Sequence, residues 1–213
     1  MGNKTHGVYL VTDRPLCLYH SLAEVVRLSA LGGVSLVQLR EKETDSRQFL
    51  ELAKHLKKIL TPFQIPLLIN DRLDICLAAG ADGVHLGQSD LPWMDARMIL
   101  GRDAIIGLSL ETKEDYHSLI KTDPKPNLDY IAVSPVFDTE TKTNTKPAWG
   151  LEGLQWLRAQ TELPIVAIGG IKESNAKEVV EAGADSIAVV SAICSANDPK
   201  LATEILSAKF TSH

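Results

Sequence analysis

Eight short runs of mostly apolar residues recur along the 213-residue chain, and they constrain its fold more than any other feature. Apolar residues follow one another within these runs, which is typical of parallel strands that are buried on both faces. The sequence therefore predicts eight buried parallel strands, at residues 8–12, 36–40, 66–69, 83–86, 105–109, 130–135, 165–169 and 186–190.

Segments with helical periodicity separate most of these runs. Ser21 to Glu24 has the form of a capping box, and Asp45 precedes a segment with one apolar face. Asp198 places an N-cap before Pro199 at the first helical position. Similar glycine-containing segments occur at residues 30–34, 79–83 and 182–186, each between a predicted helix and the next predicted strand. The alternation predicts an α/β protein with a (β/α)8 TIM-barrel fold, formed by a single domain over residues 1–213.

A doubly wound open sheet is the alternative architecture. It would favour a glycine-rich phosphate loop after the first strand. Here that strand ends in Thr12, Asp13, Arg14 and Pro15, with no such glycines, so the barrel is favoured. The longest polar interruption, residues 138–149, is interpreted as a mobile loop.

Composition narrows the class of protein. A formal net charge of −5 argues against a general nucleic-acid partner, and the apolar runs are too short to span a membrane. Residues 1–7 lack the apolar region of a secretory signal. Cys17, Cys76 and Cys194 form no metal-binding pair, which predicts reduced thiols in a cytoplasmic protein. The sequence does not determine the oligomeric state, and a homo-oligomer is compatible with it.

Polar side chains gather where the predicted strands end. Gln38, Leu39, Arg40, Glu41 and Lys42 follow the second run, and two cations that leave a strand end together indicate an anionic ligand such as a diphosphate. This segment taken alone could equally be a solvated strand end. The other strand ends favour a site, because the carboxyl ends of barrel strands meet at one face.

Two carboxylates at neighbouring strand ends suggest a Mg²⁺ site. Asp71 follows Asn70 after the third run, and Asp90 follows the fourth. Mg²⁺ prefers one or two carboxylates together with substrate phosphate oxygens and water. The alternative for each aspartate is helix capping, near Arg72 and Leu91 respectively, and a lone histidine such as His85 more often packs or hydrogen-bonds than binds metal.

Three further segments could hold phosphate groups. Lys142 lies in the polar loop and could close over substrate, or it could be a solvated lysine. Gly169 and Gly170 end the seventh run, and Val190 and Ser191 end the eighth. Barrels often bind phosphate through backbone N–H groups between their last two strands.

These residues resemble the thiamine-phosphate synthase family along nearly the whole chain, in family order. The matching segments are QLREK at 38–42, NDR at 70–72, GVHLGQSD at 83–90, IGLS at 106–109, SPVF at 134–137 with TETK at 139–142, AIGGI at 167–171 and VSAI at 190–193. The resemblance implies a transferase with small-molecule substrates. It would join 4-amino-2-methyl-5-hydroxymethylpyrimidine diphosphate to a thiazole phosphate, giving thiamine phosphate and diphosphate.

The resemblance also implies residue roles. Mg²⁺ ligands fall on Asp71 and Asp90, and the leaving-group residues are Arg40, Lys42, Ser109 and Lys142. The implied substrate-binding residues are Gln38, Leu39, Arg40, Glu41, Lys42, Asn70, Ser109, Thr139, Glu140, Thr141, Lys142, Gly170, Val190 and Ser191.

Two other functions compete with this one. A related thiazole tautomerase has a similar barrel, but it tends to lack the lysine of QLREK, the Asn-Asp pair and the Thr-x-Thr-Lys loop, all of which are present here. A non-catalytic barrel that binds phosphate ligands is the other candidate. It would bind the pyrimidine diphosphate without turnover.

Overall fold

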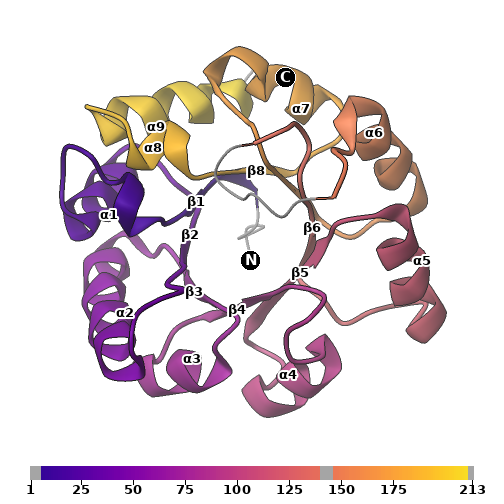
Figure 1. Cartoon of the computed structure of the whole chain (residues 1–213), viewed down its shortest axis with the longest axis horizontal. Coiled ribbons are helices and arrows are strands. Elements are labelled where there is room, and N and C mark those ends of the chain that lie inside the picture. The colour runs from indigo at the N-terminus through magenta and orange to yellow at the C-terminus, as the bar shows by residue number, and fades with distance from the viewer. Residues whose placement is uncertain (1–5, 140–145, 211–213) are drawn as a thin grey trace.

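A computed structural model describes residues 6–139 and 146–210. Eight parallel strands form a closed barrel in sequence order, and helices surround it, so the predicted (β/α)8 fold is confirmed (Figure 1). The strands are β1 (Gly7–Val11), β2 (Leu36–Leu39), β3 (Leu67–Asn70), β4 (Gly83–Leu86), β5 (Ile105–Leu110), β6 (Tyr130–Val133), β7 (Ile165–Ile168) and β8 (Ser186–Val189).

Each strand is followed by a helical segment that crosses back outside the barrel. The α-helices are α1 (Leu22–Leu31), α2 (Ser46–Leu60), α3 (Leu73–Ala79), α4 (Trp93–Leu100), α5 (Lys113–Thr122), α6 (Gly150–Gln160), α7 (Glu173–Glu181), α8 (Ser191–Cys194) and α9 (Pro199–Ser207). Short 3-10 helices are η1 (Arg14–Leu16), η2 (Thr61–Phe63) and η3 (Ala208–Phe210). No helix in the described part of the chain is long and apolar enough to cross a membrane.

The predicted helix starts are confirmed. Asp45 accepts hydrogen bonds from the backbone N–H groups of Arg47 and Gln48 at the start of α2, and Asp198 caps α9 ahead of Pro199. Ser21 caps α1 as predicted. Glu24 does not complete a capping box by accepting from the backbone N–H of Ser21, and pairs with Arg27 instead. The strand predicted at 130–135 ends earlier, at Val133, because Pro135 has no N–H to donate to a neighbouring strand.

The strands separate two apolar cores. Side chains inside the barrel include Tyr9, Leu36, Leu68 and Tyr130, whereas a larger core of intervening residues fills the space between strands and helices. Successive side chains of a strand point to opposite faces, so the two cores follow from a period of two. This rule also decides which polar residues at the strand ends can reach the interior.

Three aspartates fasten the amino ends of strands. Asp82, Asp129 and Asp185 accept hydrogen bonds from the backbone N–H groups at Leu67, Ile106 and Ile165. Each carboxylate also pairs with a cation from a surrounding helix, at Lys57, Arg97 and Arg158 respectively. Asp82 and Asp185 belong to the similar glycine-containing segments seen in the sequence. These segments therefore mark the end of the barrel where the strands begin.

Candidate active site

Inward-pointing residues at the carboxyl ends of the strands form the floor of the site. Gln38 follows Leu36 by two residues, and Asn70 likewise follows Leu68, so both lie on the inner face. Asn70 stands beside His85 in the register of β3 and β4, and Ser109 ends the inner face of β5. Gln38 and Asn70 are buried, at 3% and 8% exposure, so the predicted strand-end residues converge on the barrel interior.

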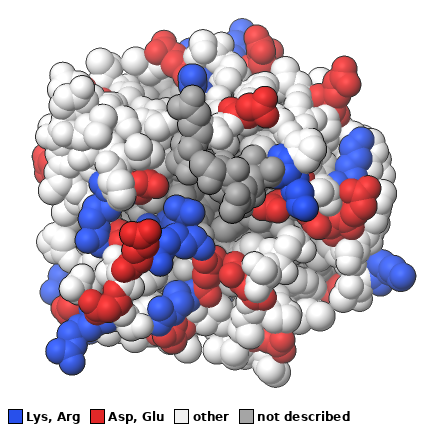
Figure 2. Space-filling model, viewed as in Figure 1, with Lys and Arg blue, Asp and Glu red and all other residues white. Residues whose placement is uncertain are grey.

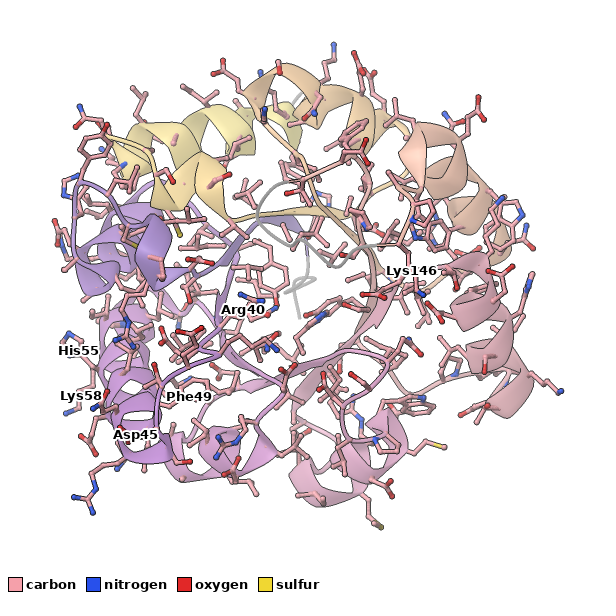
Figure 3. All side chains as sticks on the ribbon, in the orientation of Figure 1. Arg40, Asp45, Phe49, His55, Lys58 and Lys146 are labelled. Carbon is pink, nitrogen blue, oxygen red and sulfur yellow. The ribbon has the colours of Figure 1, made fainter. Side chains whose placement is uncertain are left out.

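Arg40 lies at the mouth of the barrel, inside the ring of helices, whereas Asp45 caps the outer helix α2 and Phe49 lies in its first turns (Figure 3). Its backbone N–H donates to Thr12 Oγ1 at 3.1 Å, which joins the ends of β1 and β2. Its guanidinium approaches Asp13 only to 3.9 Å, too far for a hydrogen bond. The bidentate fork of Arg40 is therefore held near the mouth with its donors available to an anion.

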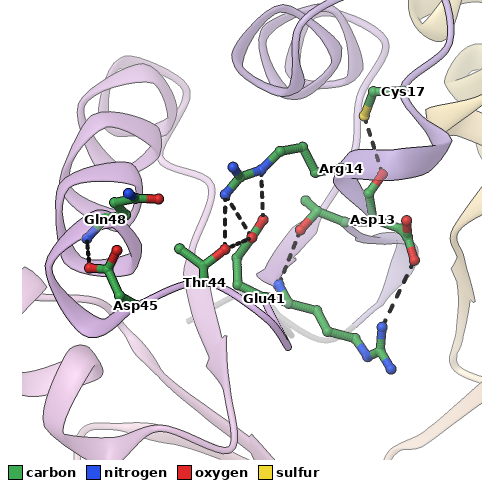
Figure 4. A network of polar contacts seen from close by, with 9 residues as sticks. Asp13, Arg14, Cys17, Glu41, Thr44, Asp45 and Gln48 are labelled. Atoms are coloured by element: carbon green, nitrogen blue, oxygen red, sulfur yellow. Dashed lines mark hydrogen bonds and ion pairs between the residues drawn. The ribbon is translucent and has the colours of Figure 1, made fainter.

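Glu41 and Leu39 support this segment from the other side. Glu41 Oε2 accepts from Arg14 Nη2 at 2.6 Å and from Thr44 Oγ1 at 2.6 Å, in the polar network of Figure 4. The Glu41 side chain is only 6% exposed, so it fastens the β2 loop to η1. The side chain of Leu39 packs in the outer core, which leaves only its backbone for any contact with substrate.

Asp71 and Lys42 form an ion pair across two strand ends. Lys42 Nζ lies 2.6 Å from Asp71 Oδ2, and the Lys42 side chain is 52% exposed. Asp71 has a left-handed backbone with φ of 62°, a region that residues other than glycine rarely adopt. Such a conformation costs roughly 1–3 kcal/mol and clusters at functional sites. Figure 2 shows acidic and basic side chains side by side around the centre of this face.

Neither aspartate caps a helix, so that alternative is wrong for both. Helix α3 has Arg72 at its N-cap and α4 has Pro92, and neither cap carries a side-chain hydrogen bond. Asp90 Oδ2 instead accepts from the backbone N–H of Gly87 at 2.7 Å, within its own loop. The two carboxylates are thus positioned by their loops and not by the needs of the following helices.

Burial raises the pKa of the Asp90 carboxyl, and its neighbour Asp71 raises it further. The second effect requires that the two carboxyl groups lie side by side. A cation between them would relieve this repulsion. Within the described residues no group of three or more His, Cys, Asp or Glu could hold a metal ion, so a bound ion would need substrate oxygens and water as its other ligands.

Two loop residues that the sequence analysis left without a role hold this region in place. A Cβ atom at Gly87 would lie 3.1 Å from Asp90 Oδ2, so the bond between Gly87 and Asp90 favours glycine. Gln88 Nε2 donates to the carbonyl of Ser109 at 2.6 Å and so ties the β4 loop to β5. The GQSD segment at 87–90 could have indicated this bond in the sequence, because a glycine before a loop carboxylate allows the backbone to approach it closely.

A second region lies between β7 and β8. Gly169 and Gly170 have positive φ values of 105° and 64°, and the four-residue helix α8 begins directly after Val190. The first N–H groups of a helix have no hydrogen-bond partner inside it, so the N–H groups of Ser191 and Ala192 do not take part in the hydrogen bonds of α8. A cavity of about 600 Å³ adjoins Gly170 and is also lined by Phe137, Asp138, Lys172 and Asn175.

Part of the predicted polar loop lies outside the described residues. Glu140, Thr141 and Lys142 fall there, and Thr139, half-buried, is the last described residue before them. Beyond them, Trp149 Nε1 donates to the carbonyl of Glu111, and Gly150 N–H donates to the carbonyl of Val136. These bonds fasten the start of α6 to β5 and β6.

Comparison with known proteins decides the family. A family model described as thiamine monophosphate synthase matches residues 8–193. The chain belongs to the thiamine monophosphate synthase family. It is an enzyme of that family, a transferase. A thiamine-phosphate synthase from Leptospira biflexa is 70% identical over 210 residues, which cover 99% of this chain and 100% of the relative.

More distant relatives agree with this assignment. A thiamine-phosphate synthase from Albidiferax ferrireducens is 52% identical and covers 92% of this chain and 87% of its own length. The solved structure of a thiamine phosphate pyrophosphorylase from Pyrococcus furiosus superposes with a TM-score of 0.86. It is 34% identical and covers 98% of this chain and 97% of that one. The chain therefore shares its fold over nearly its whole length with a solved thiamine phosphate pyrophosphorylase.

Proposed function

We propose that the enzyme joins 4-amino-2-methyl-5-hydroxymethylpyrimidine diphosphate to a thiazole monophosphate, releasing diphosphate and forming thiamine phosphate. One observation carries this proposal. Asp71 and Asp90 lie near each other without capping a helix, Lys42 pairs with Asp71, and Arg40 lies at the barrel mouth. Carboxylates intermingled with cations suit a polyanionic ligand that arrives with a divalent cation.

Mg²⁺ is the cofactor that we propose for the two aspartates. The fit rests on their chemistry: burial and the neighbouring Asp71 carboxylate both raise the pKa of Asp90, and a small cation between these hard oxygen donors would relieve the repulsion. When bound, Mg²⁺ would supply charge neutralisation for the departing diphosphate. The ion pair between Lys42 and Asp71 opposes this little, since an exposed pair is worth roughly 0–1 kcal/mol.

The protein's own residues would then assist departure of the diphosphate. Arg40 offers a planar fork of donors, Lys42 a movable charge, and Ser109 a hydroxyl at the inner end of β5. We assign Lys142 the same role from its position in the loop sequence. Fixed donors that face developing negative charge are among the strongest contributions to catalysis.

The two ring systems would occupy opposite parts of the mouth. We assign Gln38 and Asn70 to the pyrimidine, because their amides are buried at its floor. We assign the thiazole phosphate to Gly170 and Ser191, with Val190, Thr139 and Thr141 beside them. The aminopyrimidine can support positive charge on its exocyclic methylene, so the bond to diphosphate breaks first and the thiazole nitrogen attacks next. Holding both rings in line lowers the entropic part of the barrier.

The metal dependence tests this proposal. Asp90→Asn keeps the shape of the side chain and an acceptor for Gly87, so we expect an unchanged fold with kcat lowered by about a hundredfold or more. The matched control is Asp74→Asn, which removes an exposed carboxylate that pairs with Arg72 outside the site, and its kcat should stay normal. Full turnover in EDTA, or an active Asp71→Asn/Asp90→Asn double variant, would overturn the metal site.

A further inference from the structure

Five buried or half-buried side chains form one continuous chain of hydrogen bonds across the barrel interior. Gln38 Nε2 donates to Tyr9 Oη at 2.7 Å, and Tyr9 Oη lies 2.9 Å from Tyr130 Oη. Tyr130 Oη lies 2.8 Å from His85 Nδ1, and His85 Nε2 lies 2.8 Å from Ser109 Oγ. The chain therefore links the floor of the proposed pyrimidine site on β2 to the proposed diphosphate contact on β5.

The amide at one end fixes the first bond and favours one direction for the bonds that follow. An amide nitrogen only donates, so Tyr9 accepts from Gln38 and has its single proton left to give to Tyr130. Burial raises the pKa of both Tyr9 and Tyr130, so each phenol keeps that proton. In this direction Tyr130 accepts from Tyr9 and gives its own proton to His85 Nδ1.

The direction of these hydrogen bonds continues from His85 to Ser109. When Nδ1 accepts from Tyr130, the proton of a neutral His85 lies on Nε2 and is donated to Ser109 Oγ. The ring of His85 stacks on that of Tyr130, with ring planes 14° apart, which holds the imidazole in this orientation. Ser109 accepts from His85, so its own hydroxyl proton points away from the chain.

We propose that Tyr9, Tyr130 and His85 are positioning residues that hold the Ser109 hydroxyl proton directed at the departing diphosphate. This inference rests on the proposed function, which supplies the diphosphate. At the other end, the same direction keeps Gln38 Oε1 as an acceptor for the amino group of the pyrimidine. One chain thus orients the groups that meet both halves of the first substrate.

The opposite direction would place the wrong atoms in the site. If Tyr130 donated to Tyr9 instead, His85 Nδ1 would donate to Tyr130 and Ser109 would give its proton to His85 Nε2. Ser109 would then present only lone pairs to a polyanion. The tautomer of His85 distinguishes the two arrangements, since its ring proton lies on Nε2 in the first and on Nδ1 in the second.

Nitrogen-15 NMR of histidine-labelled, ligand-free enzyme measures that tautomer directly. The chain has six histidines, and loss of one set of signals in His85→Gln assigns the residue. We expect Nε2 protonated and Nδ1 unprotonated in the wild type, and a changed Nδ1 shift in Tyr130→Phe. An Nδ1-protonated or doubly protonated His85 would overturn the proposal.

Tyr116→Phe is the matched control for the tyrosine substitution. Tyr116 is also buried, but its hydroxyl donates to the carbonyl of Gln160 in the helical layer. We expect Tyr116→Phe to leave the His85 signals and kcat unchanged, whereas Tyr130→Phe should lower kcat about tenfold or more with little change in the KM for thiazole phosphate. A normal kcat in folded Tyr130→Phe would refute a positioning role.

Calorimetry with inorganic diphosphate and Mg²⁺ separates this inference from the proposed function. We expect the wild type to bind diphosphate, and both Ser109→Ala and Tyr130→Phe to bind it about tenfold or more weakly. If the wild type bound no diphosphate, the proposed function would fail even with His85 in the expected tautomer. If the wild type bound it and Tyr130→Phe bound it equally well, the inference alone would fail.

Discussion

Substitution of Gly170 by alanine tests how the β7 loop forms its part of the site. Gly170 has a φ of +64°, which disfavours any residue with a Cβ atom. An added Cβ would also lie 2.7 Å from the carbonyl oxygen of Asp138 and 2.8 Å from Phe137 Cβ. The β6 loop therefore packs directly on Gly170, and both loops border the proposed thiazole-phosphate site.

The expected loss of stability has two parts. The left-handed backbone costs an alanine roughly 1–2 kcal/mol. Overpacking against Asp138 and Phe137 adds about 1–3 kcal/mol, because one of the two clashing atoms belongs to the backbone and cannot rotate away. Gly170→Ala should therefore lower the free energy of unfolding by about 2–5 kcal/mol.

Gly80→Ala separates these two parts. Gly80 has almost the same backbone, with φ of +63°, but its added Cβ would meet nothing within 4 Å. It should lose only the backbone part, roughly 1–2 kcal/mol. Thermal denaturation should place the Tm of Gly170→Ala about 2–12 °C below that of Gly80→Ala, since 1 kcal/mol shifts Tm by about 2–4 °C at this size.

Kinetics of the same two variants test the site itself. Gly170→Ala should raise the KM for the thiazole phosphate about tenfold, because the displaced loop removes a backbone N–H from the phosphate, while Gly80→Ala leaves it unchanged. Equal Tm losses in the two variants would refute the packing of the β6 loop on Gly170. A normal thiazole-phosphate KM in folded Gly170→Ala would refute the placement of the phosphate.

Three other predictions concern single carboxylates and the loop lysine. Asp185→Ala removes the acceptor for Ile165 N–H and Arg158, so chemical denaturation should show a loss of about 1–3 kcal/mol with normal kcat; a large loss of activity per folded molecule would contradict a purely structural role. Lys142→Ala should lower kcat about ten- to a hundredfold without raising KM, and single-turnover kinetics would contradict this if only KM changed. Because the pKa of Asp90 is raised, the metal-free enzyme should lose stability as pH rises from the ordinary aspartate range through the raised value. Urea denaturation in EDTA should show this fall in unfolding free energy with rising pH. The same pH dependence in Asp90→Asn would refute its assignment to Asp90.

The sequence predicted the architecture because each level of pattern agreed with the next. Continuous apolar runs located all eight strands to within about two residues, since strands buried on both faces have no polar side to obscure them. Glycines past the helices, as at Gly80, marked the turns into the next strand, because a left-handed C-cap favours glycine. Strand ends were less well defined where polar site residues begin.

Side-chain direction was the part that linear spacing left unresolved. Leu39 lies between Gln38 and Arg40 in the sequence, yet it points to the outer core, as strict alternation along β2 would have indicated. The same alternation places Tyr9 and Tyr130 inside the barrel, where each hydroxyl needs a partner. Which partner each finds depends on contacts between strands up to 121 residues apart, and no local pattern contains that information.

The capping alternative shows the same limit at the proposed metal site. Asp71 and Asp90 both precede helices closely enough to cap them, so sequence alone left two roles open for each. The folded chain resolves this because the helices begin later, at Leu73 and Trp93, and the Asp90 carboxylate accepts from Gly87 instead. Loop geometry therefore excludes the capping role and leaves the proposed metal role.

In the proposed reaction, residues at the mouth of this barrel transfer a pyrimidine from diphosphate to a thiazole nitrogen. The most direct test mixes the pure enzyme with the pyrimidine diphosphate, the thiazole phosphate and Mg²⁺, and counts both products by chromatography. We predict that thiamine phosphate and diphosphate appear in equal amounts, and that both disappear when the thiazole phosphate or Mg²⁺ is omitted. Binding of both substrates without any thiamine phosphate, or diphosphate release with no matching thiamine phosphate, would contradict the account.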